Sequence, residues 1–413
     1  MSSETAVLRQ VHQSSEWARM HTHLVGPTGS GKSMLLVQMA LDDLTQGVGV
    51  APWMDPKDGE AADALLARIP DKWADRTVLF DPTRLDYAVG LNVLECDSPE
   101  RRDIVVDQVL GVFGALFADV WRQRQAEIMY MGLTTLMHHR GTTLCDLPRL
   151  LTDAEQRKHW VSALQDPDLQ DFWERYKSFA PGDVAPLLGR LQSLLLRPRV
   201  RNILGQRKST VDLADILDNG GIVIARLPLE LAATSQLLGS FLFLRCWQVI
   251  QGRQRRSGAL KDAAAYLDEG ELFMHIRGSV AGVFDQARGL RWGIVFAHQR
   301  MGHQLPKDMA EALDVNALTK VVFRATTLEN AKAVAGLVHP ISPETILGFQ
   351  ARQVACKLPI GRPFVGRTPE LPPALREPRE LADHALRKWG RSQKDIEEDL
   401  KGGGRRRPDP VPW

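Results

Sequence analysis

Short apolar runs alternate along this chain with longer stretches in which apolar residues recur at helical spacing. Such runs predict buried strands, and their alternation with helices is typical of a mostly parallel sheet. We expect helices over residues 34–41, 61–69 and 237–251. The expected strands cover residues 21–25, 47–54, 77–80, 221–227, 263–267, 292–297, 320–324 and 353–357. The pattern therefore predicts an α/β fold.

After the third expected strand, the chain changes character from about Pro99 to Lys208. Apolar residues recur at helical spacing over 104–110, 128–137 and 187–196, and turn residues separate these stretches. This block predicts an all-helical subdomain inserted into the sheet. The predicted division of the chain is a first part of the core (1–98), the helical insertion (99–208), a second part of the core (209–370) and a C-terminal region (371–413).

The C-terminal region is rich in proline and charge. We expect one amphipathic helix from Pro378 to Leu400 and a disordered basic tail that includes residues 402–408.

Composition is that of an ordinary soluble globular protein, with 44% hydrophobic and 25% charged residues. The formal net charge of +2 is nearly balanced, so any contact with nucleic acid must come from local patches. The four cysteines lie far apart, which indicates neither a zinc ribbon nor a disulfide framework. The chain starts without a signal-peptide pattern, and its longest apolar run, 237–250, is too short to span a bilayer. We expect a cytoplasmic protein that is able to dock on a membrane complex.

The sequence GPTGSGKS at residues 26–33 matches the phosphate-binding P-loop pattern G-x-x-x-x-G-K-[ST]. Its glycines permit backbone conformations that let successive N–H groups point at a triphosphate. Lys32 would place a charge on the β and γ phosphates, and the Ser33 hydroxyl can ligate Mg²⁺. The following helix would aim its N-terminus at the phosphates. The expected cofactors are ATP and Mg²⁺, and the expected nucleotide-binding residues are Gly26, Pro27, Thr28, Gly29, Ser30, Gly31, Lys32, Ser33 and Met34.

An acidic pair, Asp268 and Glu269, follows the expected strand over 263–267. A carboxylate at the end of a strand can orient Mg²⁺ through its water shell, and we assign this role to Asp268. Glu269 can then polarise the attacking water as a general base. A solvated acid at a helix start is the alternative for Glu269. Because a P-loop lies upstream in the same α/β pattern, we interpret the pair as a Walker B motif.

Three further residues are candidates for the hydrolytic reaction. Gln299 follows the expected strand over 292–297, where its amide would report whether the γ-phosphate is present; an ordinary polar strand end is the alternative. An arginine supplied across a subunit boundary can neutralise the charge of the transition state. Arg288 and Arg324 are the two candidates, each with the alternative of a surface or structural role, and the sequence does not choose between them.

Taken in order, these motifs resemble those of the HerA/FtsK-type P-loop motor ATPases, most closely the conjugation and type IV secretion ATPases with their coupling proteins. The matching segments are residues 26–33, 55–57, 80–83, 90–95, 172–173, 187–206, 211–217, 267–269 and 297–299. The resemblance implies a RecA-like core that works as a hexameric ring, with a central channel for DNA and with ATP as fuel.

Three features depart from the pattern of that family. Val93 stands where proline is usual, and residues 229–233 replace a segment that often contains glycine. Coupling proteins usually carry an N-terminal membrane anchor, for which there is no room before Gly26. The departures concern the membrane-bound role and leave the ATPase motifs intact, so a soluble relative from a mobile element, a phage or a defence system fits equally well.

Two basic clusters are candidate contacts for DNA. If either cluster lines the channel of a ring, its copies would bind phosphates in a salt-sensitive way. A solvated run of charges is the alternative for both clusters. The candidates are Arg197, Arg199, Arg201, Arg207 and Lys208 in the first cluster, and Arg253, Arg255 and Arg256 in the second.

Three functions use the same nucleotide site. The first is an ATP-driven DNA translocase that assembles into a ring. The second is an ATPase that moves or unfolds protein in a secretion machine; a secretion, nuclease or membrane-complex partner is compatible with either. The third is a nucleotide-switched assembly platform with slow turnover, against which Glu269 argues because a platform needs no general base.

Overall fold

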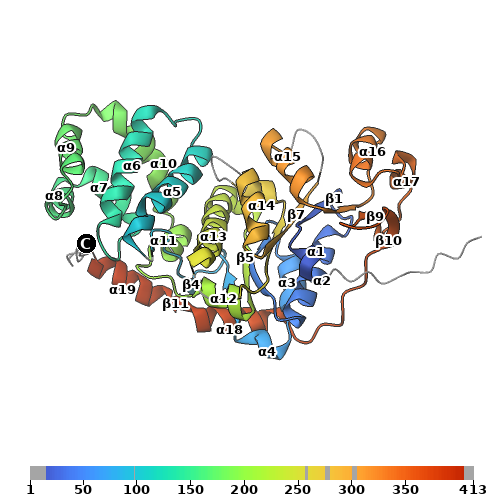
Figure 1. Ribbon diagram of the computed structural model, residues 1–413. Coiled ribbons are helices and arrows are strands. Elements are labelled where there is room, and N and C mark those ends of the chain that lie inside the picture. Colours follow the sequence, from blue (N-terminus) through green and yellow to red (C-terminus); the bar gives the residue numbers. More distant parts are fainter. Residues whose placement is uncertain (1–14, 97, 256–258, 275–279, 300–304, 404–413) are drawn as a thin grey trace, which may run out of the picture.

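One mixed sheet of nine strands lies at the centre of the described chain (Figure 1). The computed structural model describes residues 15–96, 98–255, 259–274, 280–299 and 305–403. From β8 to β3 the strands are parallel, and β9 and β10 pair antiparallel. The expectation of a mostly parallel sheet is confirmed. In spatial order the strands are β10 (Phe364–Arg367), β9 (Gln353–Lys357), β8 (Thr319–Val322), β1 (Thr22–Val25), β7 (Trp292–His298), β6 (Ala263–Asp268), β2 (Gly49–Asp55), β5 (Gly221–Arg226) and β3 (Thr77–Phe80).

Helices cover both faces of the sheet, so the central strands have no face in water. Every residue of β2, β6 and β7 is buried, as expected for parallel strands that read as continuous apolar runs. Val50 and Trp53 pack with α2 (Lys32–Thr45) and α3 (Glu60–Leu66), whereas Met54 belongs to the core on the other face. That second face carries α12 (Leu213–Asn219), α13 (Ala232–Gly252), α14 (Val280–Gly289) and α15 (Lys307–Asn316).

The described elements between Pro99 and Asn219 are all helical, and most of them form a lobe beside the sheet (Figure 1). The apolar core of this lobe is continuous with the core under α13. Trp173 is buried there, and its indole N–H donates to Thr135 Oγ1 at 2.8 Å, so this tryptophan is a core residue. The helices of the lobe are α5 (Arg102–Leu116), α6 (Gln123–Met137), α7 (Leu147–Thr152), α8 (Ala154–Ser162), α9 (Pro167–Tyr176), α10 (Pro181–Leu195) and α11 (Pro198–Leu204).

The C-terminal region differs from the single helix that we expected over residues 378–400. It forms α18 (Pro378–Trp389), a short strand β11 (Gly390–Ser392) and α19 (Gln393–Gly403). Gly390 is extended, and β11 pairs antiparallel with β4 (Tyr87–Val89), which interrupts the helix. The segment therefore crosses from the sheet to the helical lobe along one side of the molecule (Figure 1). Residues 402 and 403, which we expected in the disordered tail, belong to α19, and the rest of the expected basic tail, from residue 404 onward, lies outside the described residues.

The remaining described helices are short: α1 (Ser15–Ala18), α4 (Asp71–Ala74), α16 (Leu328–Ala335) and α17 (Pro343–Leu347). In the part of the chain that the structure describes, no helix is both long and apolar enough to cross a membrane.

Candidate nucleotide-binding site

The P-loop connects β1 to α2, as the sequence predicts. Gly26 follows β1 directly, and a Cβ at this position would lie 2.5 Å from Phe323 Cβ and 2.9 Å from Ser30 Oγ, so a larger residue does not fit without a shift. Gly29 and Gly31 have φ values of 76° and 102°, in the left-handed region that glycine tolerates. Gly31 is also the N-cap of α2. The loop therefore has the backbone that a phosphate cradle needs.

Lys32 is buried beneath this loop and is 2% exposed. Its ammonium donates hydrogen bonds to the carbonyl oxygens of Gly26 and Pro27. Burial lowers the pKa of Lys32, while the carboxylates of Glu269 and Asp268 act in the opposite direction. The loop and the two acids thus hold a buried positive charge where phosphates are expected to bind. Of the other predicted loop residues, Thr28 is exposed, and Met34 on α2 packs partly against the core.

The structure brings Ser33 and Asp268 together. Ser33 Oγ donates to Asp268 Oδ2 at 2.6 Å, although 235 positions separate the two residues in sequence. The contact arises because β6 is separated from β1 only by β7, and parallel strands present their carboxyl ends at the same edge. Asp268 is 1% exposed. A hydroxyl beside a carboxylate is the oxygen donor set that Mg²⁺ prefers.

Glu269 lies beside this pair and has an unusual backbone, with φ 47° and ψ 50°. A non-glycine residue in the left-handed region is strained, and such strain clusters at functional sites. Gln299 Nε2 donates to Glu269 Oε1 at 2.9 Å, so the two predicted residues meet at adjacent strand ends. Burial raises the pKa of Glu269, the hydrogen bond from Gln299 lowers it, and the charge of Asp268 raises it further. The carboxyl group therefore titrates above its ordinary range.

Lys57 also belongs to this site, and sequence reasoning did not assign it a role. Its ammonium donates to Ser33 Oγ and to Asp268 Oδ2, both at 3.0 Å, and lies 3.8 Å from Glu269 Oε1. Burial acts to lower the pKa of Lys57, but the neighbouring carboxylates, Asp268 first, raise it. The signal that could have found it was its position after β2, in the Asp-Pro-Lys segment that resembles a family element.

The donor atoms of this site fit a magnesium nucleotide. Among the described residues, the buried side-chain oxygens without a hydrogen-bond partner include Ser30 Oγ, Asp268 Oδ1 and Glu269 Oε2 at this site. Buried polar atoms are normally satisfied, so these three indicate a ligand that supplies donors or a cation. No atom lies within 4 Å of a Cβ built on Gly29, which leaves room above the loop. Lys32 would hold phosphate oxygens, and Ser33 and Asp268 would hold Mg²⁺.

Comparison with known proteins supports this assignment at the level of fold. No protein-family model matches the chain, and no curated protein matches it significantly. Among solved structures, the bacterial conjugative coupling protein TrwBdeltaN70 is similar with a TM-score of 0.61 and 16% identity, over 88% of this chain and 89% of that chain. The chain has the TrwB fold. This RecA-type P-loop fold confirms the fold that the resemblance to HerA/FtsK-type motors implied.

Two other solved structures are similar at comparable levels. TrwB in complex with ADP and Mg²⁺ has a TM-score of 0.61 and 14% identity, over 90% of this chain and 92% of that chain. VirB4 of Thermoanaerobacter pseudethanolicus has a TM-score of 0.57 and 11% identity, over 85% of this chain and 90% of that chain. The TrwB fold thus accommodates a nucleotide and Mg²⁺ in at least one protein.

The two candidate arginines lie at opposite ends of the strands: Arg324 at the carboxyl ends and Arg288 at the amino ends. Arg324 is exposed and follows Phe323, whose N–H donates to Val25 O at the start of the P-loop. Arg288 is exposed near the amino ends of the strands, because its carbonyl accepts from the N–H of Arg291, just before β7. Arg324 therefore lies at the edge of its own P-loop, whereas Arg288 has no access to that loop within one chain.

The basic clusters differ in exposure. Arg253 is fully buried, and its guanidinium donates to Asp218 and to backbone carbonyls, so it stabilises the fold and has no access to DNA. Arg255 is exposed, and Arg256 lies outside the described residues. In the first cluster, Arg197, Arg207 and Lys208 are exposed, Arg201 is half-buried, and Arg199 donates to the carbonyl oxygens of Pro82 and Thr83.

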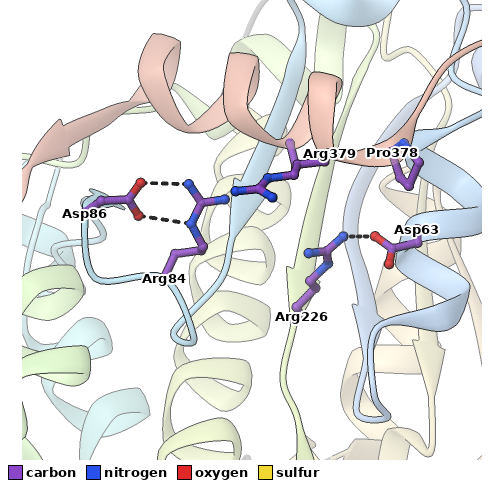
Figure 2. A pocket seen from close by; sticks show the side chains of 7 residues that line it. Asp63, Arg84, Asp86, Arg226, Pro378 and Arg379 are labelled. Atoms are coloured by element: carbon purple, nitrogen blue, oxygen red, sulfur yellow. Dashed lines mark hydrogen bonds and ion pairs between the residues drawn. The ribbon is translucent and has the colours of Figure 1, made fainter.

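A separate pocket of about 520 Å³ opens beside α18 (Figure 2). Like the P-loop, it lies at the carboxyl ends of the strands. Its arginines are already paired with acids: Arg84 makes two hydrogen bonds to Asp86, and Arg226 donates to Asp63 (Figure 2). Because these charges are compensated within the chain, the pocket does not compete with the P-loop as the nucleotide site.

Proposed function

We propose that this chain is an ATPase that couples ATP hydrolysis to the movement of DNA, working as a ring that is expected to be hexameric. The observation that carries the proposal is the meeting of Ser33, Asp268, Glu269 and Gln299 around a buried P-loop lysine. These groups come from three separate strand ends and provide phosphate binding, metal binding and a general base in one place.

Each residue has a chemical task in this proposal. Lys32 and the loop N–H groups bind the β and γ phosphates. Bound Mg²⁺ supplies charge neutralisation for the phosphates, and Ser33 and Asp268 hold it. Glu269 Oε2 is free to accept a proton from the attacking water, while Gln299 holds the other carboxylate oxygen in position. Arg324 contributes a cation at the same edge, and Arg288 would act only across a subunit boundary.

Two observations support DNA as the moved polymer. The fold is that of a conjugative coupling protein, and exposed basic residues flank α11: Arg197 precedes this helix, and Arg207 and Lys208 follow it. Arg255 is also exposed, but it lies beyond the other end of α13. Six copies of such a patch around a ring would bind a phosphate backbone strongly at low salt. A secretion, nuclease or membrane-complex partner would recruit the ring to its task.

The test measures ATP turnover with and without DNA at low and high salt. We expect DNA to stimulate turnover at low salt and to lose this effect at high salt, because phosphate contacts release counterions. Lys32→Ala should lower turnover by roughly 10²-fold or more, since it removes a preorganised charge from the transition state. If DNA does not change the rate of ATP turnover at low salt and a partner protein binds tightly, the results would favour the protein-moving ATPase. Function in cells that survives Glu269→Gln would favour the assembly platform.

A further inference from the structure

Lys57 makes contact with every acidic or hydroxyl side chain assigned to Mg²⁺ and to the attacking water. Its Nζ atom lies 3.0 Å from Ser33 Oγ, 3.0 Å from Asp268 Oδ2 and 3.8 Å from Glu269 Oε1. Ser33 Oγ in turn donates to Asp268 Oδ2, so ammonium, hydroxyl and carboxylate form a closed triangle. A Mg²⁺ ion held by Ser33, with Asp268 acting through its water shell, would need the same space beside these two oxygens.

The fold places Lys57 at this point through its backbone. Asp55 at the end of β2 is fully buried, and its carboxylate accepts the N–H of Lys57 and the N–H of Ala62, each at 3.0 Å. These two bonds fix the turn between β2 and α3. Because β2 pairs directly with β6, with Met54 opposite Leu267, the turn opens beside the Asp268 carboxylate. The two hydrogen bonds to Asp55 therefore hold the turn that places Lys57 beside the acids.

The charge of Lys57 matters because its neighbours are buried. The side chains of Asp268 and Glu269 are 2% and 6% exposed, and two adjacent carboxylates in such a place repel each other. Lys32 is occupied with the carbonyl oxygens of the P-loop, so it does not bond to either acid directly. Among the described residues, Lys57 is the cation that contacts them, and its own side chain remains 29% exposed, which leaves it a path to move aside.

We propose that Lys57 is a positioning residue that stands in for Mg²⁺: it holds Ser33 and Asp268 together before the magnesium nucleotide binds and leaves these oxygens when the metal arrives. The inference rests on the proposed function of the site as a magnesium nucleotide site. It follows that the ammonium and the divalent cation compete. Nucleotide phosphates would favour the metal ion over the Lys57 ammonium. In their absence, a metal ion alone binds weakly to the wild-type protein.

The test titrates the full chain with Mn²⁺ in the absence of nucleotide and follows free Mn²⁺ by electron paramagnetic resonance. Lys57→Met removes the competing charge, so we expect Mn²⁺ to bind at least tenfold more tightly than to the wild type. Lys57→Arg keeps the charge and should stay within about twofold of the wild type. Lys307→Met, which removes a lysine that is 91% exposed on α15, is the matched control and should change nothing.

The sign of the change separates positioning from a merely structural role. If Lys57 only stabilised the fold, Lys57→Met would weaken metal binding or leave it unchanged, and either result would overturn the proposal. Should Lys57→Met fail to fold, the double variant Lys57→Met/Asp268→Asn removes the uncompensated charge. It should fold and bind Mn²⁺ no better than the wild type. A double variant that also fails to fold, or that binds Mn²⁺ more tightly than the wild type, would overturn the proposal.

The two proposals fail in different ways. Tighter Mn²⁺ binding by Lys57→Met in a chain that never hydrolyses ATP would refute the proposed function and leave the role of Lys57 intact. Normal hydrolysis with unchanged Mn²⁺ affinity in Lys57→Met would refute the role of Lys57 alone.

Discussion

At the scale of single residues, Glu269 combines features that are rarely found together. Its backbone is in the left-handed region, its side chain is buried, and one carboxylate oxygen is held by Gln299 while the other has no hydrogen-bond partner. Strain of this kind persists only where the surrounding structure enforces it. The arrangement suits a general base whose free oxygen must face one water molecule.

Glu269→Gln should therefore separate binding from hydrolysis. We expect turnover to fall by about 10²- to 10⁴-fold, because the amide cannot accept the proton of the attacking water. Binding of a fluorescent ATP analogue should persist, since the phosphate-binding loop is unchanged. Phosphate release and analogue binding are the two measurements, with Glu311→Gln on the exposed side of α15 as the control. Full turnover by Glu269→Gln would contradict the assignment.

The hydrogen bond from Gln299 leads to a prediction about pH. A base works when it is deprotonated, and burial raises the pKa of Glu269, so turnover should begin to fall at a higher pH than for an ordinary glutamate. The bond from Gln299 lowers that pKa. Gln299→Ala should consequently move the acid limb of kcat/KM to higher pH. The check is a rate profile from pH 5 to 8 for both proteins, and an acid limb that stays in place or moves down would exclude this coupling.

At the scale of elements, the long periodic segments were predictable and the short paired ones were not. Helices α2 and α13 and the eight expected strands follow from local periodicity. In contrast, β4 and β11 have three residues each and exist because they pair with each other across about 300 positions of sequence. No local pattern encodes such a pairing, which is why the expected single C-terminal helix was wrong.

Helix α18 offers a test of how firmly the C-terminal region is attached. Leu381, Ala382, Ala385 and Leu386 are buried against α3 and β3, so the helix has one apolar face. Leu386→Ala should lower the free energy of unfolding by about 2–5 kcal/mol, through lost burial and the cavity left behind. Arg379→Ala on the same helix removes a side chain that is 86% exposed and should cost less than about 0.5 kcal/mol. Denaturant titration compares the two; equal midpoints would show that α18 does not hold the core.

At the scale of the whole molecule, the helical lobe and the sheet are joined in two ways. Their apolar residues form one continuous core under α13, and the segment from α18 to α19 runs across both along one side (Figure 1). A structural change at the nucleotide-binding ends of the strands is therefore connected to the lobe by continuously packed side chains. Under the proposed function, this continuous core would carry the effect of hydrolysis to the lobe.

The oligomeric state is the prediction at this scale. With a nonhydrolysable ATP analogue, we expect light scattering to report a multiple of the 46.1-kDa chain, six for a hexamer, because an arginine supplied in trans requires a head-to-tail contact that closes on itself. Lys32→Ala with the same analogue should remain smaller. A 46.1-kDa mass at every protein concentration would exclude a ring and, with it, translocation through a channel.

The sequence by itself determined the elements and motifs whose signal is local. The P-loop, the acids at 268 and 269 and the alternation of strands with helices are all visible in a few consecutive residues. Only the tertiary structure decided which of these residues meet. It set β6 one strand away from β1, joined Ser33 to Asp268, brought Lys57 over both, and buried Arg253 away from solvent. The reason is that strand order follows from burying both faces of the sheet at once, which depends on every element together rather than on any single segment.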